Sequence, residues 1–159
     1  MKAPKFWKKA VFWVAFSLAA GGISSYLTRR GLERFEQIAK PMVTPPRIVF
    51  PIAWTILLFL IGFGFALIRE KTMCTAQGNN AAIVFGVQMT FFFCWMIWFF
   101  SLGWYGFAAL WLIGMILSII VMINYYRKIS KPAAWMQVPY LLWCCFALYL
   151  NTGVWLLNR

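Results

Sequence analysis

The sequence predicts an all-α integral membrane protein, built as a bundle of five transmembrane helices. Of its 159 residues, 64% are hydrophobic, 20% are aromatic and only 11% are charged, whereas roughly 25% are charged in a soluble globular domain. The charges are also segregated, because the stretches 10–28, 48–68, 72–126 and 132–158 contain none. Each stretch is about as long as, or longer than, the roughly 20 residues that cross a bilayer core.

The uncharged stretch 72–126 must contain two spans, since as one helix it would extend about 80 Å against a hydrocarbon core of about 30 Å. Ser101-Leu102-Gly103 is the predicted turn between them. The five predicted spans lie near 7–27, 47–69, 80–101, 104–126 and 132–157, in one domain covering 1–159. A secretory signal peptide is the alternative interpretation of the first span, but its apolar stretch continues to Leu27.

The net charge of +12 is concentrated at the ends of the spans. This distribution suits the anionic head groups of a lipid bilayer, and no stretch resembles a nucleic-acid-binding module. The side that holds the N-terminus, Lys2 included, carries more Lys and Arg than the other side. We therefore expect the N-terminus to lie in the cytoplasm.

Several kinds of chemistry are disfavoured by the residues available. The chain has no histidine, and Glu33, Glu36 and Glu70 all lie outside the spans. Proton relays, buried metal sites and general-base catalysis usually need such groups. We therefore predict no catalytic set, no metal site and no bound cofactor, although haem ligation by Tyr, Cys or Met stays open.

The first loop, 28–46, is the longest, and its Leu32, Phe35 and Ile38 share one face of a short helix. Such a helix can lie at the membrane interface and cover one end of the bundle. The loop is therefore predicted to be a cavity lid, with a solvated loop as the alternative.

Prolines mark the entry to the second span. Because proline suits the first turn of a helix, Pro45-Pro46 predicts the helix start. Pro51 is then expected one turn further in, where its missing N–H frees a carbonyl. Pro51, Trp54 and Leu58 share one face of this helix.

The third span carries a stripe of large side chains and one amide. Gln88, Phe92, Trp95 and Phe99 recur at helical spacing. An amide within hydrocarbon needs a partner, so we expect Gln88 to face another helix or a cavity.

Earlier in the same span, Ala82 and Gly86 form a small-xxx-small pair. Such pairs permit close contact between membrane helices. The pair predicts a homodimer face, with ordinary packing within one chain as the alternative.

The fifth span repeats the pattern of aromatic and polar residues. Pro139 is expected near its start, and Tyr140, Trp143, Ala147 and Asn151 form one stripe. Periodicity alone is more typical of packing. Aromatic faces with a few neutral hydrogen-bonding groups are nevertheless the composition of a pocket for a flat, apolar ligand.

Three ordered stretches carry a resemblance to a known family: Lys40-Pro41-x-x-Thr44-Pro45-Pro46-x-x-Val49-Phe50-Pro51-x-x-Trp54-Thr55, then Gln88-x6-Trp95-x3-Phe99-Phe100, then Pro139-Tyr140-x-x-Trp143-x-x-Phe146-Ala147-x-x-Leu150-Asn151-x3-Trp155-x2-Asn158. Together they resemble the tryptophan-rich sensory protein and peripheral-type benzodiazepine receptor family, also called the translocator protein (TspO/MBR) family. The resemblance covers essentially the whole chain.

The resemblance implies a five-helix bundle, commonly dimeric, with a cavity closed by the first loop. It implies binding of porphyrins such as protoporphyrin IX, of synthetic benzodiazepine-type and isoquinoline-type ligands and, in animals, of cholesterol. Transport, ligand-responsive signalling and light-dependent and oxygen-dependent porphyrin breakdown are the alternative functions it offers. It makes the bacterial cell membrane the expected location, with a bacterial or mitochondrial outer membrane as the alternative.

Site residues follow from the resemblance position by position. Trp54 and Trp143 resemble the cavity tryptophans of the family, and Trp95 and Phe99 resemble the wall from the third helix. Ala147 and Leu150 resemble the cavity floor. Leu58, Gln88, Phe92, Tyr140 and Asn151 complete the predicted ligand set, and Arg34, Phe35 and Arg47 are predicted to cover the ligand and contact its carboxylates.

The chain also departs from the family pattern. Arg34-Phe35 replaces Trp-Tyr, Val43 replaces Trp, and Leu58 replaces Tyr. Phe92 and Met96 occupy positions where the family has Asn and Ser, which removes a hydrogen-bonding amide. Thr152 stands where the cholesterol motif has Tyr.

Overall fold

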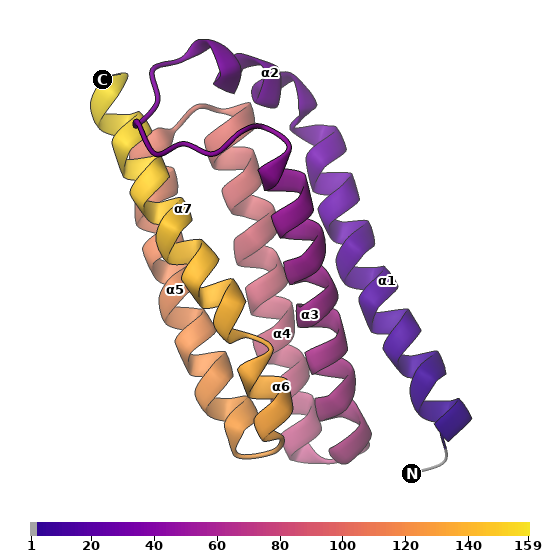
Figure 1. Cartoon of the computed structure of the whole chain (residues 1–159). Coiled ribbons are helices and arrows are strands. Elements are labelled where there is room, and N and C mark those ends of the chain that lie inside the picture. Colours follow the sequence, from indigo (N-terminus) through magenta and orange to yellow (C-terminus); the bar gives the residue numbers. More distant parts are fainter. Residues whose placement is uncertain (1–2) are drawn as a thin grey trace.

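The computed structural model describes residues 3–159, so Lys2 lies outside the described residues. Five long helices run side by side: α1 (Ala3–Leu27), α3 (Val49–Lys71), α4 (Ala76–Met96), α5 (Tyr105–Arg127) and α7 (Val138–Leu157) (Figure 1). Five segments are long and apolar enough to cross a membrane, namely Lys5–Gln37, Val49–Lys71, Ala76–Ser101, Tyr105–Arg127 and Lys131–Leu157. The predicted five-span architecture is confirmed.

Helix α1 packs closely along α3. A β-carbon at Gly62 of α3 would lie 2.6 Å from the carbonyl oxygen of Trp13 and 2.8 Å from Cα of Val14. Only a glycine fits such an approach of two backbones. The first span is thus a helix of the bundle, as its transmembrane interpretation predicts.

Helix α3 begins later than the prolines suggest. Pro45 and Pro46 lie in the connection, where the Val49 N–H donates to the Pro46 carbonyl at 2.9 Å, and α3 starts at Val49. The prediction of a start at Pro45-Pro46 is therefore wrong by one turn. Pro51 then falls in the first turn of α3. The backbone N–H groups of a first helical turn have no acceptor within the helix, so the missing N–H of Pro51 leaves no carbonyl without its hydrogen bond.

The last span is interrupted near its start. It consists of the short helix α6 (Lys131–Trp135) and of α7, which begins at Val138 with Pro139 as its second residue. A proline ring clashes with the carbonyl four residues earlier, here that of Trp135, so one continuous helix cannot form. The Gln137 side chain donates to the Ala133 carbonyl at 3.2 Å beside the break.

Helix α4 ends in a π turn, Ile97–Ser101, in which the Leu102 N–H bonds the Ile97 carbonyl at 3.0 Å. Gly103 follows with φ +67°, so the chain turns within the predicted hinge. The wider turn buries two consecutive rings, Phe99 and Phe100.

Helix α2 (Arg29–Gln37) lies at the end of the bundle where α7 also ends (Figure 1). Its Gly31 sits on the backbone of Phe100, where any β-carbon would collide with the carbonyl. The predicted short helix of the first loop therefore exists and packs directly on the π turn.

Candidate functional site

Five aromatic side chains from three helices meet inside the bundle, and we call them the ring cluster: Trp54 of α3, Phe92 and Trp95 of α4, and Tyr140 and Trp143 of α7. Trp54 is central, because its ring centroid lies 4.8 Å from Phe92, 5.8 Å from Trp95, 6.2 Å from Tyr140 and 6.4 Å from Trp143. These separations are typical of aromatic rings in contact. The structure thus brings together five of the six predicted ligand-binding rings, and the sixth, Phe99, contacts Trp95.

A second group of rings connects the ring cluster to α2. Phe35 of α2 lies 5.6 Å from Phe99, 5.7 Å from Phe100 and 6.3 Å from Phe50. Phe50 in turn lies 6.0 Å from Trp143, and Phe99 lies 5.7 Å from Trp95. Phe35 therefore belongs to a continuous aromatic surface that reaches the ring cluster.

The amide of Gln88 has two protein partners. Its Nε2 donates to the Tyr140 hydroxyl at 2.7 Å, and its Oε1 accepts from the Ser118 hydroxyl of α5. The side chain is 1% exposed, so burial without these partners would be costly. Gln88 faces a partner helix, as predicted, and its hydrogen bonds join α4, α5 and α7.

Asn151 is engaged in the same way. Its Oδ1 accepts from Trp95 Nε1 at 3.2 Å, and its Nδ2 donates to the Tyr105 carbonyl at 2.7 Å. Both ends of this amide therefore stabilise the bundle and orient the Trp95 ring.

One fully buried polar group of the ring cluster has no partner within residues 3–159. The indole N–H of Trp143 is buried, and no acceptor lies within hydrogen-bonding distance among residues 3–159. Buried N–H groups in proteins are nearly always paired. The Trp143 N–H is thus a donor without a protein acceptor, whereas the predicted polar contacts Gln88, Tyr140 and Asn151 are hydrogen-bonded within the chain.

The other predicted residues occupy varied positions. Leu58 is buried, and its side chain fills the space that a β-carbon on Gly21 of α1 would need. Ala147 and Leu150 are buried on α7. Arg47 forms an ion pair with Glu36 at 2.9 Å, whereas exposed Arg34 has no ion pair within the described part of the chain.

The sequence did not predict three neighbours of the candidate site: Phe50, which contacts Trp143, Phe100, which contacts Phe35, and Ser118, which bonds Gln88. Phe50 lies within the quoted proline motif, so the resemblance held a signal for it. Phe100 follows Phe99 directly and would point elsewhere in a regular α-helix, where successive side chains are about 100° apart. The π turn that reorients it leaves no periodic signal in the sequence, so the signal for Phe100 was its place beside Phe99 in the second motif of the resemblance.

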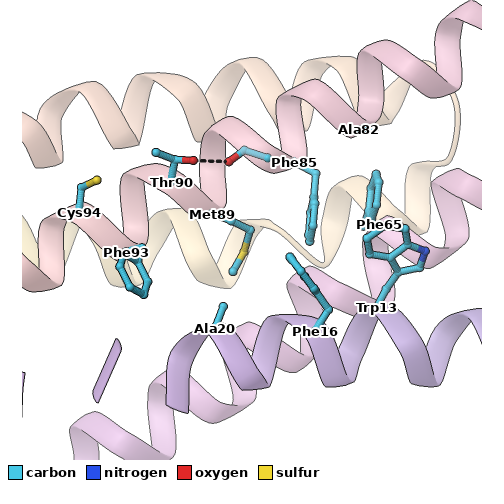
Figure 2. A pocket seen from close by; sticks show the side chains of 11 residues that line it. Trp13, Phe16, Ala20, Phe65, Ala82, Phe85, Met89, Thr90, Phe93 and Cys94 are labelled. Carbon is cyan, nitrogen blue, oxygen red and sulfur yellow. Dashed lines mark hydrogen bonds between the residues drawn. The ribbon is translucent and has the colours of Figure 1, made fainter. Parts of the chain in front are cut away.

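A second aromatic surface lies between α1 and α4, in a groove of about 410 Å³. Figure 2 shows Phe65 and Phe85 face to face beside Trp13, with Phe16 and Met89 directed into the groove. The Phe65 and Phe85 centroids are 4.1 Å apart. Ala82 and Gly86, the predicted dimer face, line this groove and not the ring cluster.

Helices long enough to span a bilayer, with an aromatic cluster between them, define a multi-pass helical membrane protein. The TspO/MBR family model matches residues 13–156. The chain belongs to the TspO/MBR family.

Its relatives come from distant organisms. The tryptophan-rich protein TspO of Archaeoglobus fulgidus is 32% identical and covers 94% of this chain and 97% of its own. The tryptophan-rich protein TspO of Chlorobaculum tepidum is 28% identical, over 91% of this chain and 92% of its own. The translocator protein of Ovis aries is 30% identical, over 92% of this chain and 89% of its own.

Proposed function

We propose that the protein binds porphyrin-type tetrapyrroles, protoporphyrin IX among them, at the ring cluster and carries them within the membrane. The observation that supports this most directly is the unpaired, buried N–H of Trp143, whose ring contacts Trp54 at the centre of the ring cluster. Rings offer broad stacking area, and a buried unpaired donor is satisfied by an acceptor on the ligand.

The rings of the ring cluster touch one another, so a planar ligand enters only if they separate. Trp54 contacts rings on both α4 and α7, and its displacement would open a slot between these helices. Binding would then exchange contacts among side chains for stacking on the ligand.

Helix α2 is proposed as the lid of this site. Phe35 lies over Phe99 and Phe100, and Arg34 has no ion pair in the described residues with which a ligand carboxylate would compete. Arg47 is held by Glu36, so it contacts a carboxylate only after exchanging partners. We therefore assign the first carboxylate contact to Arg34, since an arginine can bind a carboxylate with two hydrogen bonds.

Quenching of tryptophan fluorescence by protoporphyrin IX tests the proposal. In Trp143→Phe the ring remains and the N–H is lost, so we expect affinity to fall about 2- to 12-fold, the value of one neutral hydrogen bond. Trp135→Phe is the matched control, because Trp135 is 71% exposed on α6. Unchanged affinity in both Trp143→Phe and Trp54→Phe would contradict binding at the ring cluster.

The same complex separates binding from porphyrin breakdown. We propose carriage without catalysis, so illuminated porphyrin should be recovered intact under nitrogen and, under air, should be lost no faster with the wild type than with Trp143→Phe. Loss of porphyrin that needs both oxygen and Trp143 would instead favour the enzymatic alternative. Passage of porphyrin across proteoliposomes, compared with ligand-dependent capture of a partner, then distinguishes transport from signalling.

We also infer that a second copy of the chain covers the groove between α1 and α4. A β-carbon at Gly86 would have no neighbour within 4 Å, so packing within the chain does not explain this glycine. Gly86→Leu should lower the dimer fraction measured by light scattering in detergent. Gly22→Leu is the control, since Gly22 is equally open but does not line the groove; equal dimer fractions in the two variants would contradict the inference.

A further inference from the structure

The segment 38–48 joins α2 to α3, and we call it the strap. It crosses the end of the bundle to the C-terminal end of α7 and then returns to α3 (Figure 1). Phe35 lies just before it and Phe50 just after it, with their rings 6.3 Å apart. The strap therefore connects the two rings that link α2 to Trp143.

Asn158, directly after α7, fastens the strap by two hydrogen bonds to one residue. Its Nδ2 donates to the Ala39 carbonyl at 2.8 Å, and its Oδ1 accepts from the Ala39 N–H at 3.2 Å. Within residues 3–159, these are the hydrogen bonds that join the strap to a segment distant in sequence. The pair imitates the two bonds exchanged by opposed residues of antiparallel strands.

A steric contact supports the same attachment. A β-carbon at Gly153 of α7 would collide with the ring of Pro41, two residues after Ala39. The Glu36–Arg47 ion pair and the Lys40 ammonium, 5.0 Å from the Phe35 ring, connect α2 and the strap only to each other. At the C-terminal end of α7, attachment of the strap thus depends on Asn158 and on the Pro41–Gly153 contact, whereas Ile38, at the start of the strap, packs against the buried core.

We propose that Asn158 is a positioning residue that holds the strap closed beside the ring cluster, and that separation of Asn158 from Ala39 is the step that admits and releases the ligand. The gating step rests on the proposed function, whereas the closure itself does not. Asn158 does not touch the ring cluster, so its two bonds stabilise the closed strap equally with and without ligand.

Stopped-flow quenching by protoporphyrin IX tests the gating step. In Asn158→Ala the association and dissociation rates should both rise about tenfold, the combined value of two partly exposed hydrogen bonds. The Kd should change less than about threefold, because closed states with and without ligand are weakened alike. Asn158→Asp keeps the acceptor for the Ala39 N–H but sets a carboxylate oxygen against the Ala39 carbonyl, so both rates should rise in this variant as well.

Asn124→Ala is the matched control. Asn124 Nδ2 donates to the Ile120 carbonyl at 3.0 Å, which reproduces the local bond from Asn158 Nδ2 to the Val154 carbonyl at 2.8 Å without any distant partner. Its rates should equal those of the wild type. A rise in Asn124→Ala as large as in Asn158→Ala would overturn the assignment to the strap.

Hydrogen exchange at the Ala39 amide tests the closure without ligand. Exchange should be faster in Asn158→Ala and in Gly153→Ala, which displaces Pro41, than in the wild type and in Asn124→Ala. Unchanged exchange in both strap variants overturns the closure. Faster exchange with unchanged association and dissociation rates of the ligand overturns the gating step alone. Absence of quenching in the wild type overturns the proposed function together with the gating step. In that case hydrogen exchange still tests the closure.

Discussion

The ring cluster around Trp54 and the groove between α1 and α4 are both lined by aromatic side chains, yet they hold different polar groups. Beside the ring cluster, Gln88 and Asn151 form hydrogen bonds to other helices, and within it the Trp143 N–H has no acceptor in the described residues. In the groove, Thr90 donates to the Gly86 carbonyl of its own helix at 2.9 Å. Aromatic content alone therefore does not distinguish the ring cluster from the groove, whereas the hydrogen-bond partners of their polar groups do.

The largest expected effect comes from removing the central ring of the ring cluster. Trp54→Ala should lower the free energy of unfolding by about 3–5 kcal/mol, because four neighbouring rings lose a contact. Phe93→Ala in the groove should cost less than about 1 kcal/mol, since this partly buried side chain can be replaced by detergent or lipid chains. Reversible unfolding in mixed micelles measures both, and equal losses would remove the distinction between the two surfaces.

A smaller effect is expected from the polar groups. Asn151→Leu leaves the Trp95 N–H without an acceptor and should cost about 1–3 kcal/mol. Thr90→Val removes only a bond within α4 at an exposed position and should change stability by less than about 0.5 kcal/mol. The same unfolding experiment compares the two variants. A larger loss of unfolding free energy in Thr90→Val than in Asn151→Leu would show that polar contacts in the groove contribute more to stability than those at the ring cluster.

The smallest effect is expected at Gly86. In a detergent that keeps the chain monomeric, Gly86→Ala should raise the thermal unfolding midpoint slightly, by the equivalent of up to about 1 kcal/mol, because alanine favours a helix and the new β-carbon meets nothing within 4 Å. Gly31→Ala should act in the opposite direction, since its β-carbon collides with the Phe100 carbonyl. Destabilisation of the monomer by Gly86→Ala would mean that the groove is filled by the chain itself.

Much of this architecture is predictable from residue patterns. Uncharged stretches predicted the five spans, and stripes at helical spacing predicted which helix face holds Trp54, Trp95 and Trp143. That these three side chains meet was an expectation from the family resemblance, and the structure brings them together around Trp54. Such patterns report which face a residue occupies, because they depend only on helical geometry.

The hydrogen-bond partner of a side chain depends on tertiary contacts, so it cannot be predicted from helical spacing. Ser118 and the Tyr105 carbonyl come from α5, a helix whose sequence has no distinctive stripe, so the full engagement of Gln88 and Asn151 was not foreseeable. The bond between Asn158 and Ala39 joins residues 119 positions apart, and no local pattern encodes it. The later start of α3 follows from a turn of four residues that proline tolerates as readily as it tolerates a helix start.

The π turn at Ile97–Ser101 bears on how helix lengths can change in this chain. A π turn holds one residue more than an α-helical turn, so it acts as a one-residue insertion that the helix has absorbed. Deleting one residue there would restore regular winding and rotate the following side chains by about 100°, which would exchange the ring that meets Phe35 and the backbone on which Gly31 sits. An alignment gap of one residue between this chain and a relative should therefore be placed within 97–101, and a relative with such a gap is expected to pack its first loop on a different side chain.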